Sequence, residues 1–134
     1  MPMDEESSMV KLSRAFAFGC LVLLAILSWL PGEEMLRTGF NGRIEHVIAY
    51  LGTSAAVSLP YALRIGQFRL IGMLVCYAGV LELGQNFSPG RNASVLDFLA
   101  SSLGVVAGAV AFRVACRLSR ATPIGLVMRR INRA

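Results

Sequence analysis

Residues 70–83 read LIGMLVCYAGVLEL, an apolar run interrupted near its end by one carboxylate, Glu82. Three further apolar stretches occur in the chain: Ala15 to Leu30, Val47 to Leu63 and Phe98 to Phe112. With its polar flanks, each stretch approaches the roughly 17 to 25 residues that a helix needs to span a bilayer. Backbone amides in lipid must be satisfied within a helix or a closed barrel, and continuous apolar runs are not typical of barrel strands. The sequence therefore predicts an all-α fold, a four-helix transmembrane bundle.

The composition agrees with a membrane protein. The chain has 134 residues, of which 55% are hydrophobic and 16% charged, and its mean hydropathy is +0.61. A soluble domain of this size needs more polar surface. Cys20, Cys76 and Cys116 lie in separate apolar stretches, and one histidine with scattered carboxylates makes no metal ligand set, so we expect no metal and no cofactor.

The basic residues predict an orientation. If the N-terminus is cytoplasmic, most of the 13 Lys and Arg residues fall inside, whereas Arg37, Arg43 and Arg91 fall outside. The positive-inside rule then gives an N-in/C-in topology. The net charge of +5 is explained by this topology and by contact with anionic membrane lipids, so no nucleic-acid partner is expected.

Three regions are expected along the chain. Residues 1–11 form a polar, disordered N-terminal tail, residues 12–115 form the four-helix domain, and residues 116–134 form a basic cytoplasmic tail. The tail has apolar residues at helical spacing, which predict an amphipathic helix on the inner leaflet; the alternative is a flexible basic tail. These apolar residues are Ile124, Val127, Met128 and Ile131.

Polar side chains gather on the predicted outer side of the membrane, beside or inside apolar stretches. An intramembrane charge costs roughly 2.5 to 3.5 kcal/mol, so such residues usually face a bundle interior or a wet cavity. They are the candidate ligand-binding residues: Arg43, His46, Tyr50, Glu82, Gln85, Arg91, Ser94 and Asp97.

Spacing suggests roles for several of these residues. Glu82 and Gln85 are three residues apart and project from one face of a helix. Ser94 and Asp97 have the spacing of a capping box, so Asp97 is either a site residue or a helix-capping carboxylate. Arg91 is the expected counter-ion for one of these carboxylates or for a ligand phosphate, because a guanidinium binds such groups bidentately.

The fourth stretch contains a second motif. Gly104 and Gly108 have the G-x-x-x-G spacing that lets another helix backbone approach closely. The partner is either another helix of the same bundle or a separate membrane protein.

Taken together, these motifs resemble the VanZ-like family of small bacterial membrane proteins. The resemblance runs from Leu27 to Val114 through Arg43-x-x-His46, Glu82-x-x-Gln85 and Pro89-Gly90-Arg91-x-x-Ser94-x-x-Asp97, followed by the glycine motif. The chain departs from the family at Gly42-Arg43, where Asp-Lys is common, and at Ser101, where Asn is common.

The resemblance implies a multi-pass protein of the bacterial cytoplasmic (inner) membrane and cell envelope. The founding member of the family is linked to low-level resistance to the glycopeptide antibiotic teicoplanin. The first hypothesis, motivated by the mixed-charge cluster on the predicted outer side, is an envelope protein that binds an anionic or amphiphilic ligand, such as a lipid-linked precursor or a lipoglycopeptide. The alternatives are an enzyme acting on a polyprenyl-phosphate-type headgroup and a structural subunit of a larger membrane complex. The sequence does not decide whether the protein is an enzyme.

Overall fold

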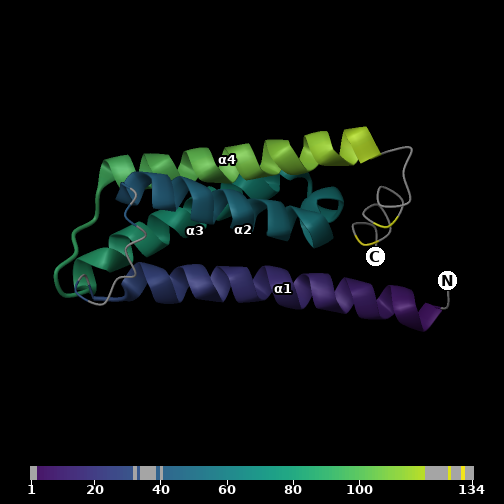
Figure 1. The fold of residues 1–134 in the computed structure, drawn as a ribbon, viewed down its shortest axis with the longest axis horizontal. Helices are drawn as coiled ribbons and strands as arrows, with labels where there is room; N and C mark the ends of the chain where they lie inside the picture. The colour runs from purple at the N-terminus through teal and green to yellow at the C-terminus, as the bar shows by residue number, and fades with distance from the viewer. Residues whose placement is uncertain are drawn as a thin grey trace.

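The computed structural model describes residues 3–31, 33, 39, 41–119, 127 and 131. Within these residues the secondary structure is entirely helical (Figure 1). The elements in chain order are α1 (Met3–Trp29), α2 (Gly42–Ile65), α3 (Gln67–Gly84), the short 3₁₀ helix η1 (Gln85–Phe87) and α4 (Val95–Leu118). The predicted all-α class is confirmed for the described part of the chain.

Local signals set several helix ends. The Asn41 side chain caps α2 by accepting a hydrogen bond from the Arg43 backbone N–H, at 3.1 Å. Gly66 has a φ of 84°, a conformation that glycine adopts without steric cost, and it alone separates α2 from α3. Ser94 caps α4 as its spacing predicted, accepting from the Asp97 backbone N–H at 3.4 Å.

Helices α2 and α3 each contact the three other α-helices, and the contact between α2 and α4 is the most extensive in the fold. In Figure 1, α2 and α3 lie between α1 and α4. The close α2–α4 contact depends on the two predicted glycines. A Cβ on Gly104 would lie 2.5 Å from the Val47 carbonyl oxygen, and one on Gly108 would collide with the Leu51 carbonyl oxygen. The G-x-x-x-G motif therefore packs within this chain, which is the first of its two predicted uses.

Three of the helices that the structure describes are long and apolar enough to cross a membrane. They cover Ser8–Trp29, Gln67–Phe87 and Val95–Leu118. Helix α2, the fourth predicted span, is not among these three; it contains the polar residues Thr53, Ser54 and Ser58, which are buried. The Ser54 hydroxyl, for example, donates to the Val105 carbonyl oxygen at 2.7 Å, so part of the polar character of α2 is satisfied inside the protein.

The observed boundaries differ from the predicted regions. Residues 3–11 were expected to be disordered, but they form the first turns of α1, and Val10 is buried. No proline or glycine interrupts this segment, and early acidic residues favour the start of a helix. Residue 116, the predicted start of the tail, lies inside α4. The predicted C-terminal amphipathic helix falls largely outside the described residues; Val127 and Ile131, which are described there, are both helical.

Candidate functional site

The predicted polar residues share one end of the structure. The C-terminal ends of α1 and α3 meet the N-terminal ends of α2 and α4 there (Figure 1). Successive helices run in opposite directions, so polar residues from distant parts of the chain lie together at this end of the structure.

The segment between α3 and α4 is folded by its own polar groups. The Asn86 side-chain oxygen accepts from the Ala93 backbone N–H at 2.8 Å, and the Arg91 N–H donates to the Ser88 carbonyl at 3.2 Å. Gly90, with a φ of 74°, provides the turn between them. This compact loop fixes the starting point of the Arg91 side chain.

Glu82 is buried, with 6% of its surface exposed. Its Oε1 atom accepts a 2.7 Å hydrogen bond from the backbone N–H of Ser94, the residue that caps α4. A buried carboxylate needs such donors because desolvation otherwise penalises its charge. Glu82 therefore joins the end of α3 to the start of α4.

Gln85 lies between Glu82 and Arg91 and is 2% exposed. One orientation of its amide satisfies all three neighbours. Its nitrogen then donates to Glu82 Oε1 at 3.3 Å, and its oxygen accepts from Arg91 Nη2 and from Ser28 Oγ, each at 3.0 Å. The amide thus separates a carboxylate from a guanidinium while binding both.

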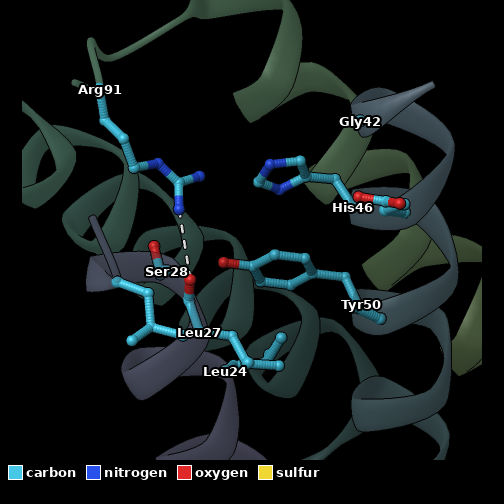
Figure 2. A pocket seen from close by; sticks show the side chains of 10 residues that line it. Leu24, Leu27, Ser28, Gly42, His46, Tyr50 and Arg91 are labelled. Carbon is cyan, nitrogen blue, oxygen red and sulfur yellow. Dashed lines mark hydrogen bonds between the residues drawn. The ribbon is translucent and has the colours of Figure 1, made fainter. Parts of the chain in front are cut away.

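Arg91 also contacts α1. Its Nη1 donates to the Leu27 carbonyl oxygen at 3.2 Å (Figure 2). Ser88 makes a parallel contact, its hydroxyl donating to the Trp29 carbonyl at 3.0 Å. These acceptors belong to the last turn of α1, where carbonyls lack partners within the helix and attract cations.

The ion pair at this end involves a different arginine. Arg91 was expected to pair with Glu82, Asp97 or a ligand phosphate, but Asp97 pairs with Arg43, whose Nε lies 3.4 Å from Asp97 Oδ1. The reason is geometric. Arg43 starts α2 and Asp97 starts α4, and these two helices pack together closely.

His46 and Tyr50 lie one turn apart on α2 with stacked rings, their centroids 6.4 Å apart and their planes inclined by 12°. His46 Nδ1 is 3.1 Å from the Ser101 hydroxyl of α4, which orients the imidazole. Ser101, one turn after Asp97 on α4, is itself buried.

A cavity of about 290 Å³ opens between α1, α2 and the α3–α4 loop. Figure 2 shows Arg91 and His46 pointing toward one another across it, with the Tyr50 ring below. Its walls include Leu24, Leu27 and Ser28 of α1, and His46 and Tyr50 of α2, together with Arg91. The cavity therefore combines a cation and polar side chains with leucine walls.

A second cavity, also about 290 Å³, lies between α3 and α4 and is lined by Glu82, Ser94 and Phe98 among others. The eight predicted residues are thus divided. Arg91, His46 and Tyr50 line the first cavity, Glu82 and Ser94 line the second, and Gln85 connects the two groups. Arg43 and Asp97 form their own pair.

Sequence reasoning missed the contribution of α1. Ser28 and the Leu27 carbonyl hold Gln85 and Arg91, yet a serine in an apolar run and a backbone carbonyl give no sequence signal of their own. In the part of the chain that the structure describes, no group of three or more His, Cys, Asp or Glu side chains is arranged to hold a metal ion.

No family model, curated protein or solved structure matches this chain.

Proposed function

We propose that this chain is a VanZ-like, multi-pass protein of the bacterial inner membrane, with both termini cytoplasmic, and that it binds an anionic amphiphile of the cell envelope. The binding site is the cavity bounded by α1, α2 and Arg91. One observation carries the proposal: the Arg91 guanidinium is held by the neutral oxygens of Leu27 and Gln85 beside a cavity with leucine walls.

The chemistry of the cavity supports an amphiphile. Small-molecule sites are mostly apolar, with a few polar groups that fix the ligand's orientation. Leu24 and Leu27 offer apolar contact, while Arg91 provides donors suited to a phosphate or carboxylate. A lipid-linked envelope precursor and a lipoglycopeptide such as teicoplanin both combine these two chemical features.

An enzymatic function on a polyprenyl-phosphate headgroup has less support. Ser94, His46 and Asp97 are residue types that could form a catalytic triad, but the Ser94 side chain caps α4 and the Asp97 carboxylate pairs with Arg43. His46 instead contacts Ser101, whose 1% exposure leaves its hydroxyl out of reach of a substrate.

A docking subunit that uses the glycine motif also has less support. Gly104 and Gly108 are buried against α2, so that face of α4 is already covered within the chain. Docking through these residues would require α2 to leave its place.

The proposal is tested by lipids that co-purify with the protein. We expect mass spectrometry of detergent-purified protein to find anionic amphiphiles bound to the wild type and to Arg43→Gln, and to find them depleted in Arg91→Gln. Arg43→Gln is the matched control because Arg43 lies at the same end but pairs with Asp97. Equal amounts on all three proteins would refute the proposed site.

The link to resistance is tested separately. Expression of the wild type in a teicoplanin-susceptible host is expected to raise the inhibitory concentration of teicoplanin, and expression of Arg91→Gln is not. An unchanged inhibitory concentration with the wild type would remove the resistance role while leaving lipid binding intact.

A further inference from the structure

His46 presents one of its ring nitrogens to the cavity. Its Nδ1 atom lies 3.1 Å from the Ser101 hydroxyl of α4, and the ring is stacked with that of Tyr50. The other nitrogen, Nε2, has no hydrogen-bond partner among the residues that the structure describes. Figure 2 shows the outer edge of the imidazole directed across the cavity toward Arg91. Nε2 is therefore available to a ligand that occupies the cavity.

The contact with Ser101 suits both charge states of the imidazole. A neutral imidazole has one N–H donor and one acceptor nitrogen, whereas a protonated imidazole has two donors. The Ser101 hydroxyl can donate to Nδ1 or accept from it, so this hydrogen bond is kept when the ring is protonated. Helix α4 thus orients His46 without fixing its charge, and in the protonated ring Nε2 is a donor.

Arg91 opposes a second positive charge across the cavity. Its guanidinium is charged, and the oxygens of Leu27 and Gln85 that it binds are neutral. A nearby like charge disfavours the charged form of a group, whereas a nearby opposite charge favours it. An anion lying between Arg91 and His46 therefore favours protonation of the imidazole. Histidine is the side chain whose charge ordinarily changes between pH 5 and 8, so anion binding is coupled to proton uptake in this range.

The surroundings of His46 contain further charged or titratable groups. Arg43 and Asp97 pair with each other, and the Tyr50 side chain is a phenol, a group that is ordinarily neutral in this pH range. Glu45 lines the same cavity and has an interaction of its own. In the part of the chain that the structure describes, the charged or titratable groups at this end of the molecule, besides His46 and Arg91, are Glu33, Arg43, Glu45, Tyr50, Glu82 and Asp97.

Resting on the proposed function, we infer that His46 is a second binding residue of the cavity and takes up a proton from water when an anionic headgroup binds between it and Arg91. Phosphate and carboxylate headgroups share the oxyanion chemistry that both side chains recognise. The protonated Nε2 donates to one oxygen and the Arg91 guanidinium donates to another, and the new N–H bond is the one covalent change. The amphiphile is therefore bound more tightly as the pH falls.

Reciprocity sets the size of the effect. An opposite charge within about 4 to 6 Å typically shifts the pKa of a group by at least one unit. Because binding and protonation are linked, the affinity for the anion changes by the same factor. We therefore expect the affinity to be about tenfold higher at pH 5.5 than at pH 8.

The proton is followed directly by NMR. His46 is the only histidine in the sequence, so full-length protein labelled at histidine reports on a single ring. The probes are phosphatidylglycerol, an anionic phosphodiester, and phosphatidylcholine, which is zwitterionic; each is added at a low mole fraction to neutral-detergent micelles. The midpoint of the His46 titration is expected to rise by about one pH unit with phosphatidylglycerol and not with phosphatidylcholine. Arg91→Gln experiences the same micelle surface and is expected to show no such rise.

The affinity is measured through Trp29, the only tryptophan in the sequence. It directly follows Ser28, which lines the cavity, and lipids with brominated chains quench tryptophan fluorescence at short range. Brominated phosphatidylglycerol is titrated at pH 5.5 and pH 8, and brominated phosphatidylcholine gives the background at each pH. Excess inorganic sulfate at constant ionic strength is expected not to displace phosphatidylglycerol, because the apolar chain contributes to binding.

Two neighbouring substitutions identify the group that takes up the proton. His46→Gln is expected to bind phosphatidylglycerol equally at the two pH values, because glutamine has no charge to gain. Glu45→Gln removes the titratable group next to His46 on the same cavity wall and is expected to keep the tenfold change. Far-UV circular dichroism confirms the helical content of each variant at both pH values before titration.

Each contrary outcome overturns a separate statement. Phosphatidylglycerol binding that is equal at the two pH values, but lost in Arg91→Gln, overturns the proton uptake and leaves the proposed function standing. A pH dependence that persists in His46→Gln, or that vanishes in Glu45→Gln, overturns the role of His46. Displacement by sulfate assigns the site to a free oxyanion and overturns the headgroup. Wild-type binding by Arg91→Gln at both pH values overturns the inference and the proposed function together.

Discussion

The backbone N–H of Ser94 donates a 2.7 Å hydrogen bond to the Glu82 carboxylate, so the residue that caps α4 is itself held by the end of α3. This contact accounts for a carboxylate that is poorly placed for its own helix, since a negative charge near a helix C-terminus is unfavourable. The Glu82–Ser94 hydrogen bond stabilises the tertiary structure instead, because it fixes the α3–α4 loop from which Arg91 extends.

Loss of the Glu82 acceptor is expected to destabilise the fold. Glu82→Leu leaves the part-buried Ser94 N–H without its carboxylate, and an unsatisfied donor costs up to about 1 to 3 kcal/mol when it is fully buried. Glu82→Gln retains an oxygen acceptor and is expected to cost less. Thermal unfolding in detergent, followed by circular dichroism, measures both. A Glu82→Leu variant as stable as the wild type would contradict the role given to this contact.

The glycines of the α2–α4 contact are expected to tolerate no side chain. Gly108→Ala places a Cβ against the Leu51 carbonyl, and overpacking of this kind costs about 1 to 3 kcal/mol. Gly52→Ala is the matched control, because a Cβ there meets nothing within 4 Å. Since alanine favours helix by about 1 kcal/mol over glycine, the control is expected to be neutral or stabilising. Equal unfolding temperatures for the two variants would refute close packing at Gly108.

The Arg43–Asp97 pair is expected to contribute little. The two side chains are 53% and 30% exposed, and exposed pairs couple by about 0.2 to 1 kcal/mol. A double-mutant cycle with Arg43→Gln and Asp97→Asn measures this coupling energy, and added salt is expected to reduce it. A coupling above about 2 kcal/mol would show instead that the pair is shielded from solvent.

Trp29 is expected to report on its contact with Gly84. A Cβ at Gly84 would lie 2.5 Å from the Trp29 indole nitrogen, so Gly84→Ala displaces the ring. The emission maximum of Trp29 is expected to shift, with a smaller loss of stability than in Gly108→Ala, because a side chain moves more readily than a helix backbone. An unchanged emission spectrum would contradict the contact.

The proposed topology is tested by labelling. Single cysteines at Asn92, in the α3–α4 loop, and at Arg117, near the other end of α4, are introduced after Cys20, Cys76 and Cys116 are replaced. A membrane-impermeant maleimide is expected to label position 92 in cells with only the outer membrane permeabilised, and position 117 only after lysis. The reverse pattern would invert the N-in/C-in assignment.

Much of the architecture followed from local sequence. The apolar run of residues 70–83 became most of α3, and Ser94 capped α4 at the predicted position, because hydrophobicity and capping act over a few residues. The second apolar stretch was marked from Val47, whereas α2 begins one polar turn earlier, at Gly42. Its polar first turn is capped by the Asn41 side chain.

The partners of the site residues depended on the tertiary structure. The sequence by itself predicted that Arg91, His46 and Glu82 lie at one end of the molecule. The reason is that they fall near the ends of successive apolar helices, which run in alternating directions. It did not determine that Arg91 binds the end of α1, that Asp97 pairs with Arg43, or that Gln85 separates Arg91 from Glu82. Those contacts depend on how the helices rotate and approach one another; the Arg43–Asp97 pair, for example, requires α4 to pack closely on α2, as it does at Gly104 and Gly108.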